Sequence, residues 1–137
     1  MDLTGTKLTA RHTFSNNSGA ITVLAFHPAG DQLAAGDTVG KVILYNAVLK
    51  EMVTQNWVFH TARIASIGWS PSGRYAVSGS LDTNIYVWDR EAPSKRIAVL
   101  AAHKLGVTGT IFLDETTVVS AGADACVKTW KLKHHHH

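Results

Sequence analysis

Cysteine and long apolar runs are scarce in this chain of 137 residues. Cys126 is the only cysteine, so an internal disulfide is impossible and a reducing compartment such as the cytosol is expected. The apolar runs, such as residues 21–26 (ITVLAF), are far shorter than the roughly 20 residues that a membrane-spanning helix needs. Met1 and Asp2 open directly into polar sequence, unlike a signal peptide. These absences predict a cytoplasmic protein without a membrane partner.

Concentrated positive charge is also missing. The formal charge is only +3, and apart from Lys95 and Arg96 the basic residues are scattered singly, so no basic stripe predicts a nucleic-acid partner. Half of the eight histidines, residues 134–137, resemble the remnant of a purification tag and are therefore not candidates for metal ligands. The glycine-rich pieces lack the glycine spacing and the following helix of a phosphate-binding loop. The sequence therefore predicts no metal and no cofactor.

What the chain does have is a repeat of about 43 residues. Residues 78–89 (SGSLDTNIYVWD) align with residues 35–46 (AGDTVGKVILYN) and with residues 120–131 (SAGADACVKTWK). The second half of each segment alternates between two kinds of side chain, as the two faces of a β-strand do. The repeat therefore predicts three structural units of the same kind.

Each unit divides into short alternating segments that are bounded by turn residues, which is typical of strands. Strands are expected at residues 20–26, 32–35, 41–45 and 52–59 in the first unit, 64–69, 75–78, 84–88 and 95–100 in the second, and 107–112, 117–120 and 126–130 in the third. A further outer strand is expected at residues 7–14. Four strands in a repeat of about 43 residues are typical of the blades of a β-propeller. The chain is therefore predicted to be all-β, a three-blade segment over residues 1–133 with blades at 20–59, 63–100 and 106–131.

Two features resemble the WD-repeat family. Trp88 and Asp89 form the dipeptide that names this family, and His60 and His103 stand where the family has a histidine before the innermost strand of a blade. In such blades a histidine, a serine or threonine, an aspartate and a tryptophan form a hydrogen-bonded chain. The resemblance implies two structural tetrads, His60, Ser78, Asp82 and Trp88 in the second blade and His103, Ser120, Asp124 and Trp130 in the third.

The first unit departs from this pattern. The residues at its four tetrad positions are Asn17, Ala35, Val39 and Tyr45. The first blade is therefore expected to be held by apolar packing alone and to be the least rigid of the three. His27 lies in a turn without a partner at ligand spacing, so a surface position is expected rather than a role as metal ligand.

Histidine, serine and aspartate are also the residue types of a hydrolytic triad, which is recognised by its geometry. In this chain the set His60, Ser78 and Asp82 recurs one repeat later. A catalytic site is rarely duplicated along a repeat, whereas a structural element is duplicated in every unit. The sequence therefore predicts a scaffold and not an enzyme.

A scaffold of this kind acts through its surface loops. The loops that lead into the innermost strands and the turns between the second and third strands are expected to share one face. The candidate partner-binding residues on that face are Arg63, Leu81, Lys104 and Leu105. Residues 61–89 and 102–130 resemble the last two blades of the actin-interacting members of the WD-repeat family. That resemblance implies actin and cofilin as partners and a cytoskeletal location.

The strand count leaves both ends of the segment open. The third unit lacks a fourth strand, and three blades are too few to close a ring. Head-to-tail self-assembly is therefore expected, with residues 7–14 of one copy paired with residues 126–130 of the next. A six-bladed dimer and a nine-bladed trimer need about the same strain, and the greater frequency of dimers favours the dimer. An engineered chain that assembles into propellers without a native ligand is the alternative interpretation.

Overall fold

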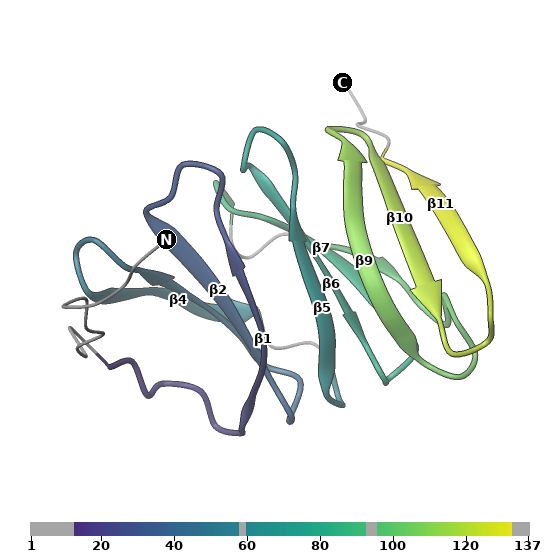
Figure 1. Cartoon of the computed structure of the whole chain (residues 1–137), viewed down its shortest axis with the longest axis horizontal. Helices are drawn as coiled ribbons and strands as arrows, with labels where there is room; N and C mark the ends of the chain where they lie inside the picture. Colours follow the sequence, from purple (N-terminus) through teal and green to yellow (C-terminus); the bar gives the residue numbers. More distant parts are fainter. Residues whose placement is uncertain (1–12, 58–59, 93–95, 133–137) are drawn as a thin grey trace, which may run out of the picture.

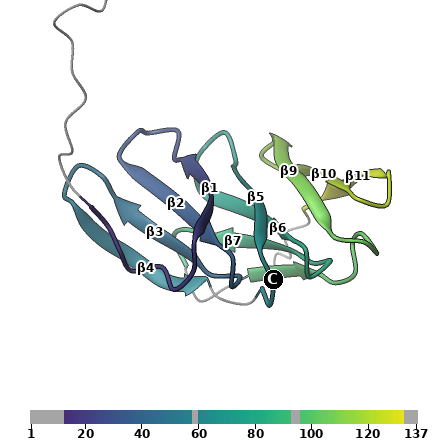
Figure 2. The ribbon, with the colours of Figure 1, turned by 60° about the horizontal axis from the view of Figure 1, so that its bottom comes forward.

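Eleven strands and no helix make up the part of the chain that the computed structural model describes, residues 13–57, 60–92 and 96–132 (Figure 1). The strands form three antiparallel sheets that lie side by side (Figure 2). The prediction of an all-β chain is confirmed. Within these ranges there is no helix that could cross a membrane.

The first sheet, called blade 1, is a four-stranded meander. Its strands are β1 (Ile21–Phe26), β2 (Gln32–Asp37), β3 (Val42–Asn46) and β4 (Glu51–Trp57), in the order β1-β2-β3-β4. The turn from β1 to β2 contains Gly30 at φ +81°, a left-handed conformation that favours glycine. Residues 58–59, which the sequence assigns to the fourth strand, lie outside the described residues.

Blade 2 repeats this arrangement, and blade 3 has three strands among the described residues. Blade 2 consists of β5 (Ile64–Trp69), β6 (Tyr75–Ser80), β7 (Ile85–Asp89) and β8 (Arg96–Val99), and blade 3 of β9 (Val107–Asp114), β10 (Thr117–Gly122) and β11 (Val127–Lys131). Most of the outer strand expected at residues 7–14 lies outside the described residues, and residues 13 and 14 belong to no strand. β11 is therefore an edge strand within the described part of the chain.

Blades 1 and 2 meet at an apolar seam, that is, a contact surface between two neighbouring blades. Trp57 stacks on Trp88 with ring centroids 5.5 Å apart, and Trp69 lies against Trp57 at 6.2 Å. At the edge of this seam His27 is only 4% exposed. Its Nδ1 accepts a backbone N–H, so its Nε2–H donates to the carbonyl oxygen of Gly73 at 2.9 Å. The expected surface position of His27 is therefore wrong, because the ring is buried where it bonds blade 1 to blade 2.

Blades 2 and 3 meet at a second seam that combines apolar packing with hydroxyl groups. Val77, Ile85 and Val107 are at most 1% exposed there. The hydroxyl of Thr110 donates to Ser66 Oγ at 3.0 Å, and the hydroxyl of Ser66 donates to the carbonyl oxygen of Thr110 at 3.2 Å. Each seam therefore buries apolar side chains of two sheets. Hydroxyl groups tie the innermost strands together, from Thr22 to the carbonyl oxygen of Ile64 in the first seam and between Ser66 and Thr110 in the second.

Among the described residues, no further sheet covers the two outward faces of this array. Ile21 in β1 is 48% exposed, whereas its repeat equivalents Ile64 and Val107 are fully buried by the preceding blade. At the other end Val127 in β11 is 73% exposed, whereas its equivalent Ile85 is 1% exposed. The same repeat position is thus buried or exposed according to whether another blade covers it. Exposed apolar faces of this kind are typical of interaction surfaces.

The turns between second and third strands lie beside the loops that lead into the innermost strands. The backbone N–H groups of Thr38, Leu81 and Ala123 donate to the carbonyl oxygens of residues 20, 63 and 106, one pair in each blade. These segments form one edge of the molecule, at the bottom of Figure 1. This edge is called the loop face, and it comprises residues 16–20, 37–41, 60–63, 80–84, 103–106 and 122–126.

Candidate functional site

The tetrad of blade 2 forms a continuous hydrogen-bonded chain that runs from the loop face into the first seam. The carboxylate of Asp82 lies 3.0 Å from His60 Nδ1 and accepts the backbone N–H of Thr61 at 2.9 Å. His60 Nε2 lies 2.8 Å from Ser78 Oγ, which accepts the indole N–H of Trp88 at 2.7 Å. The serine oxygen therefore bridges the imidazole and the indole, and these buried polar atoms all have partners.

Burial determines the protonation of His60. Its side chain is fully buried, and this desolvation lowers the pKa of His60 below its ordinary value, although the charge and hydrogen bond of Asp82 oppose the shift. The neutral ring carries its proton on Nδ1, which faces the carboxylate, and accepts the hydroxyl proton of Ser78 at Nε2. This arrangement leaves Ser78 Oγ free to accept from Trp88.

Blade 3 repeats the tetrad with similar distances. His103 Nδ1 lies 2.9 Å from the carboxylate of Asp124, and His103 Nε2 lies 2.8 Å from Ser120 Oγ. Ser120 Oγ accepts the indole N–H of Trp130 at 2.9 Å. Burial raises the pKa of Asp124, but the hydrogen bonds from His103 and from the N–H of Cys126 outweigh it and hold this pKa below its ordinary value.

Blade 1 has a different polar cluster at the corresponding place. Asn17 Nδ2 donates to Asp37 Oδ2 at 3.0 Å, and the hydroxyl of Tyr45 donates to Asn17 Oδ1 at 2.8 Å. The prediction that apolar packing alone holds blade 1 is therefore wrong. Burial raises the pKa of Asp37, but hydrogen bonds from Lys41, Asn17 and Val39 outweigh it and hold this pKa below its ordinary value. Burial also raises the pKa of Tyr45, which keeps its hydroxyl a donor.

One aspartate in blade 1 accepts the turn N–H groups that two residues accept in blade 2. Asp37 stands at the repeat position of Ser80, ahead of the position of Asp82. Its Oδ1 accepts the backbone N–H groups of Val39 and Lys41, both at 3.0 Å. In blade 2 the equivalent bonds are divided between Ser80 and Asp82. A comparison of fixed tetrad positions misses this cluster, although an aspartate at the start of a turn is a signal for such capping.

The tetrads give a substrate no access to their hydroxyl groups. Ser78 is fully buried, Ser120 is 1% exposed, and each hydroxyl is engaged by a histidine and a tryptophan. Nucleophilic catalysis needs a hydroxyl that can reach a bound substrate. Among the residues described here, no group of three or more His, Cys, Asp or Glu side chains could hold a metal ion. The polar networks therefore act by fixing the loop face.

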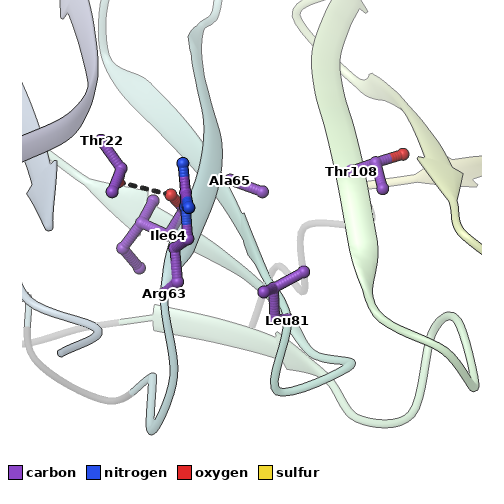
Figure 3. A pocket seen from close by; sticks show the side chains of 6 residues that line it. All are labelled: Thr22, Arg63, Ile64, Ala65, Leu81 and Thr108. Carbon is purple, nitrogen blue, oxygen red and sulfur yellow. Dashed lines mark hydrogen bonds between the residues drawn. The ribbon is translucent and has the colours of Figure 1, made fainter. Parts of the chain in front are cut away.

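Two of the four candidate contact residues, Arg63 and Leu81, line a hollow at the loop face. The hollow has a volume of about 340 Å³ and is lined by Thr22, Arg63, Ile64, Ala65, Leu81 and Thr108 (Figure 3). Three of these residues occupy one repeat position on the innermost strands β1, β5 and β9. Lys104 and Leu105 do not line the hollow, but the next residue, Gly106, lies against Leu81, where an added Cβ would be 3.2 Å from Leu81 Cα.

The four candidate contact residues give the loop face exposed basic and apolar side chains. Arg63 and Lys104 are exposed, and Leu81 and Leu105 are 49% and 69% exposed. The aspartates in the described part of this face are engaged by the polar networks: Asp37, Asp82 and Asp124. The face therefore offers a partner positive charge and apolar contact, and the carboxylates of these three aspartates are not free to pair with its basic side chains.

Comparison with known proteins identifies the repeat. The family described as "WD domain, G-beta repeat" matches residues 8–46 and 52–89. The chain is 37% identical over 131 residues to the 66 kDa stress protein of Physarum polycephalum, covering 96% of this chain and 22% of that protein. It is 40% identical over 116 residues to actin-interacting protein 1 of Caenorhabditis elegans, covering 82% of this chain and 19% of that protein. The chain thus spans about a fifth of the length of these relatives.

Solved structures agree on the fold. The WD40 repeats of RRP9 superpose with a TM-score of 0.77 at 19% identity, covering 85% of this chain and 37% of that one. The β-propeller domain of Myceliophteria_thermophila Cps50 (Swd1) superposes with a TM-score of 0.70 at 21% identity, covering 85% of this chain and 40% of that one. The three sheets are therefore β-propeller blades, and the chain belongs to the WD-repeat family, with actin-interacting protein 1 among its homologues.

Proposed function

We propose that the loop face is a protein-binding surface and that the chain is a non-catalytic interaction scaffold. The observation that carries this proposal is the exposed group of Arg63, Leu81, Lys104 and Leu105. The aspartates Asp82 and Asp124 of the same face are already hydrogen-bonded to the histidines of the tetrads. The two tetrads and the Asp37 cluster hold the loops in place, so that little conformational entropy is lost on binding. Positive charge next to exposed leucines suits a partner segment with acidic and apolar side chains.

Actin is the partner that the names of the relatives suggest, and the family resemblance of residues 61–89 and 102–130 adds cofilin to this proposal. Relatives from Caenorhabditis elegans and Drosophila melanogaster are named actin-interacting protein 1. This chain corresponds to 19% of each of them, so its share in such an interaction is part of the proposal. We assign the protein to the cytoplasm, in association with the actin cytoskeleton.

Co-sedimentation with actin filaments, with and without cofilin, tests this proposal. The chain is expected in the pellet, and Arg63→Glu and Lys104→Glu are each expected to remove most of it because attraction becomes repulsion. Lys50→Glu is the matched control, since it makes the same charge change at an exposed lysine in the β3–β4 turn, at the opposite edge from the loop face. A chain that stays in the supernatant contradicts the proposal and favours an engineered assembly without a native ligand.

The proposal includes head-to-tail self-assembly. Phe14 lies against Tyr45 with ring centroids 4.4 Å apart, one repeat before the stack of Trp57 on Trp88. Trp57 ends β4, the outer strand of blade 1. By the same spacing, this proposal assigns residues 7–14, most of which lie outside the described part of the chain, to the outer strand of a preceding blade. The family match supports this reading, because one matched unit begins at residue 52 in β4 and the other at residue 8.

The preceding blade in this proposal is blade 3 of another copy. Its edge strand β11 has no outer neighbour among the described residues, and residues 7–14 of the second copy supply one. A ring of six blades from two copies and a ring of nine from three both follow from this pairing. Light scattering is expected to give two or three times the monomeric mass, and a monomeric mass at all concentrations contradicts self-assembly.

A further inference from the structure

The two seams within one copy depend on a glycine at the same repeat position. A Cβ added to Gly36 in β2 would lie 2.7 Å from Ile64 Cγ2. A Cβ added to Gly79 in β6 would lie 2.4 Å from Val107 Cγ1 and 2.8 Å from Thr110 Cγ2. Non-bonded carbon atoms do not approach so closely, so neither seam has room for a methyl group at this position.

Blade 3 has a methyl group at this position. Ala121 in β10 is the repeat equivalent of Gly36 and Gly79. Its cross-strand neighbour on β9 is Gly109, whereas the neighbours of the two glycines are larger, Val23 and Ser66. In blade 3 the larger residue of this cross-strand pair is therefore on the second strand, whereas in blades 1 and 2 it is on the innermost strand.

Blade 1 presents the surface that would face Ala121 in a neighbouring copy. Ile21 and Leu24 in β1 are 48% and 60% exposed. They occupy the repeat positions of Val107 and Thr110, the two residues that lie closest to Gly79. A seam with the internal spacing therefore brings the side chain of Ile21 onto Cβ of Ala121.

A second copy is the occupant of this face that the chain itself indicates. Phe14 packs on Tyr45 as Trp57, the last residue of β4, packs on Trp88 one repeat later. Residues 7–14 reach up to about 26 Å when extended, which is more than the five residues of β11 need. In the proposed self-assembly, the neighbouring copy whose residues 7–14 pair with β11 therefore also brings its β1 against the open face of blade 3.

We propose, on the basis of the proposed self-assembly, that Ala121 makes the seam between copies wider than the seams within a copy. Ile21 of the neighbouring copy is displaced toward a hollow of about 200 Å³ on blade 3, which is lined by Gly109, Thr110, Ile111, Val119, Ser120 and Ala121. A Cβ added to Gly109 would meet only Cβ of Ala121, at 4.0 Å, so the hollow has room for a side chain. A wider seam makes fewer close contacts, so the assembly dissociates there while each copy stays folded.

Sedimentation velocity over a range of protein concentrations tests the role of Ala121. Ala121→Gly is expected to lower the dissociation constant between copies about tenfold, because it removes an overpacked methyl group, and Ala121→Val is expected to raise it by a similar factor. Ala98→Gly is the matched control, since it removes a methyl group from an exposed position in β8 and is expected to leave the dissociation constant unchanged. Circular dichroism verifies that each variant is folded.

A double-mutant cycle with Ile21→Val locates the contact. The effects of Ala121→Gly and Ile21→Val on the dissociation constant are expected to be non-additive, because the two side chains meet across copies. If wild type and Ala121→Gly are both monomeric at every concentration, the proposed self-assembly is overturned, and this inference with it. If wild type assembles and Ala121→Gly leaves the dissociation constant unchanged or raises it, only the role of Ala121 is overturned.

Discussion

Blades 1 and 2 secure the turn at the loop face with different side chains that serve the same backbone donors. In blade 2, Ser80 and Asp82 each accept one N–H of the turn, and Asp82 also holds His60. In blade 1, Asp37 accepts both equivalent N–H groups and holds Asn17. The constant element is the set of partly buried N–H groups of the turn, which need acceptors. The side chain that supplies the acceptor can move along the chain.

The aromatic ends of the two clusters differ in reach. The indole N–H of Trp88 meets Ser78 on the neighbouring strand, whereas the hydroxyl of Tyr45 extends to the loop residue Asn17. Ala35, at the repeat position of Ser78, therefore needs no hydroxyl group. Each cluster is consistent within itself, and single residues cannot be exchanged between them without leaving a polar atom unpaired.

The largest effect is expected from removing the acceptor of blade 1. Asp37→Ala removes the acceptor of the N–H groups of Val39 and Lys41 and one of the two acceptors of Asn17 Nδ2, so the free energy of unfolding is expected to fall by about 3 kcal/mol. Urea unfolding measures this change. Glu91→Ala, which removes an exposed carboxylate paired with Arg74, is the control and is expected to change little. A similarly small effect of Asp37→Ala would restore the view that apolar packing alone holds blade 1.

A smaller effect is expected from exchanging the serine of blade 2 and the alanine of blade 1. Ser78→Ala removes the partner of two buried groups, the indole N–H of Trp88 and Nε2 of His60, and is expected to lower the free energy of unfolding by about 2 kcal/mol. Ala35→Ser adds a buried hydroxyl to a cluster that is already satisfied and is expected to give no gain in stability. Thermal unfolding of both variants measures the difference. Stabilisation by Ala35→Ser would mean that blade 1 is an incomplete tetrad.

Strands were the most predictable feature of this chain. The alternation over residues 64–69 predicts β5 with the bounds that the structure has, because the repeat presents the same pattern three times. The second strand of blade 2 is predicted over residues 75–78, whereas β6 continues to Ser80. Gly79 and Ser80 have the composition of a turn, but pairing with β5 extends over both of them. Local composition alone could not supply that long-range pairing.

The polar clusters differ in predictability for a related reason. The tetrads have nearly constant spacing, so two copies of the pattern identify residues such as His60 and His103. Asn17, Asp37 and Tyr45 follow no repeated spacing, and only the fold brings the side chains of Asn17 and Asp37 within 3.0 Å. The burial of Ile21 and its equivalents is likewise decided by neighbouring blades and not by the residue itself.

Acidification is expected to weaken blade 2 before blade 1. The pKa of His60 is lowered on folding. At a pH below about 6.5, the pKa of histidine in the unfolded chain, the unfolded chain therefore binds a proton that the folded chain does not. The free energy of unfolding consequently decreases as the pH decreases. The lowered pKa of Asp37 keeps its contribution intact until the pH falls below about 4. Amide-exchange protection factors at about pH 7.5 and 5.5 are expected to fall around Ser78 and not around Tyr45. An equal fall in both blades contradicts this difference.

The smallest effect concerns the turn residue at which the blades also differ. Gly40 in blade 1 has φ +95°, and the equivalent residue in blade 2, Thr83, has φ +77°, a conformation that is strained for a β-branched side chain. Thr83→Gly relieves this strain but makes the unfolded chain more flexible, so the net gain in the free energy of unfolding is expected to be about 0.5 kcal/mol. Thr83→Ala, which keeps Cβ and removes the hydroxyl and methyl groups attached to it, is the control and is expected to gain less. Thermal unfolding distinguishes the two variants. A loss of stability with Thr83→Gly would mean that the threonine side chain stabilises the turn by more than its strain costs.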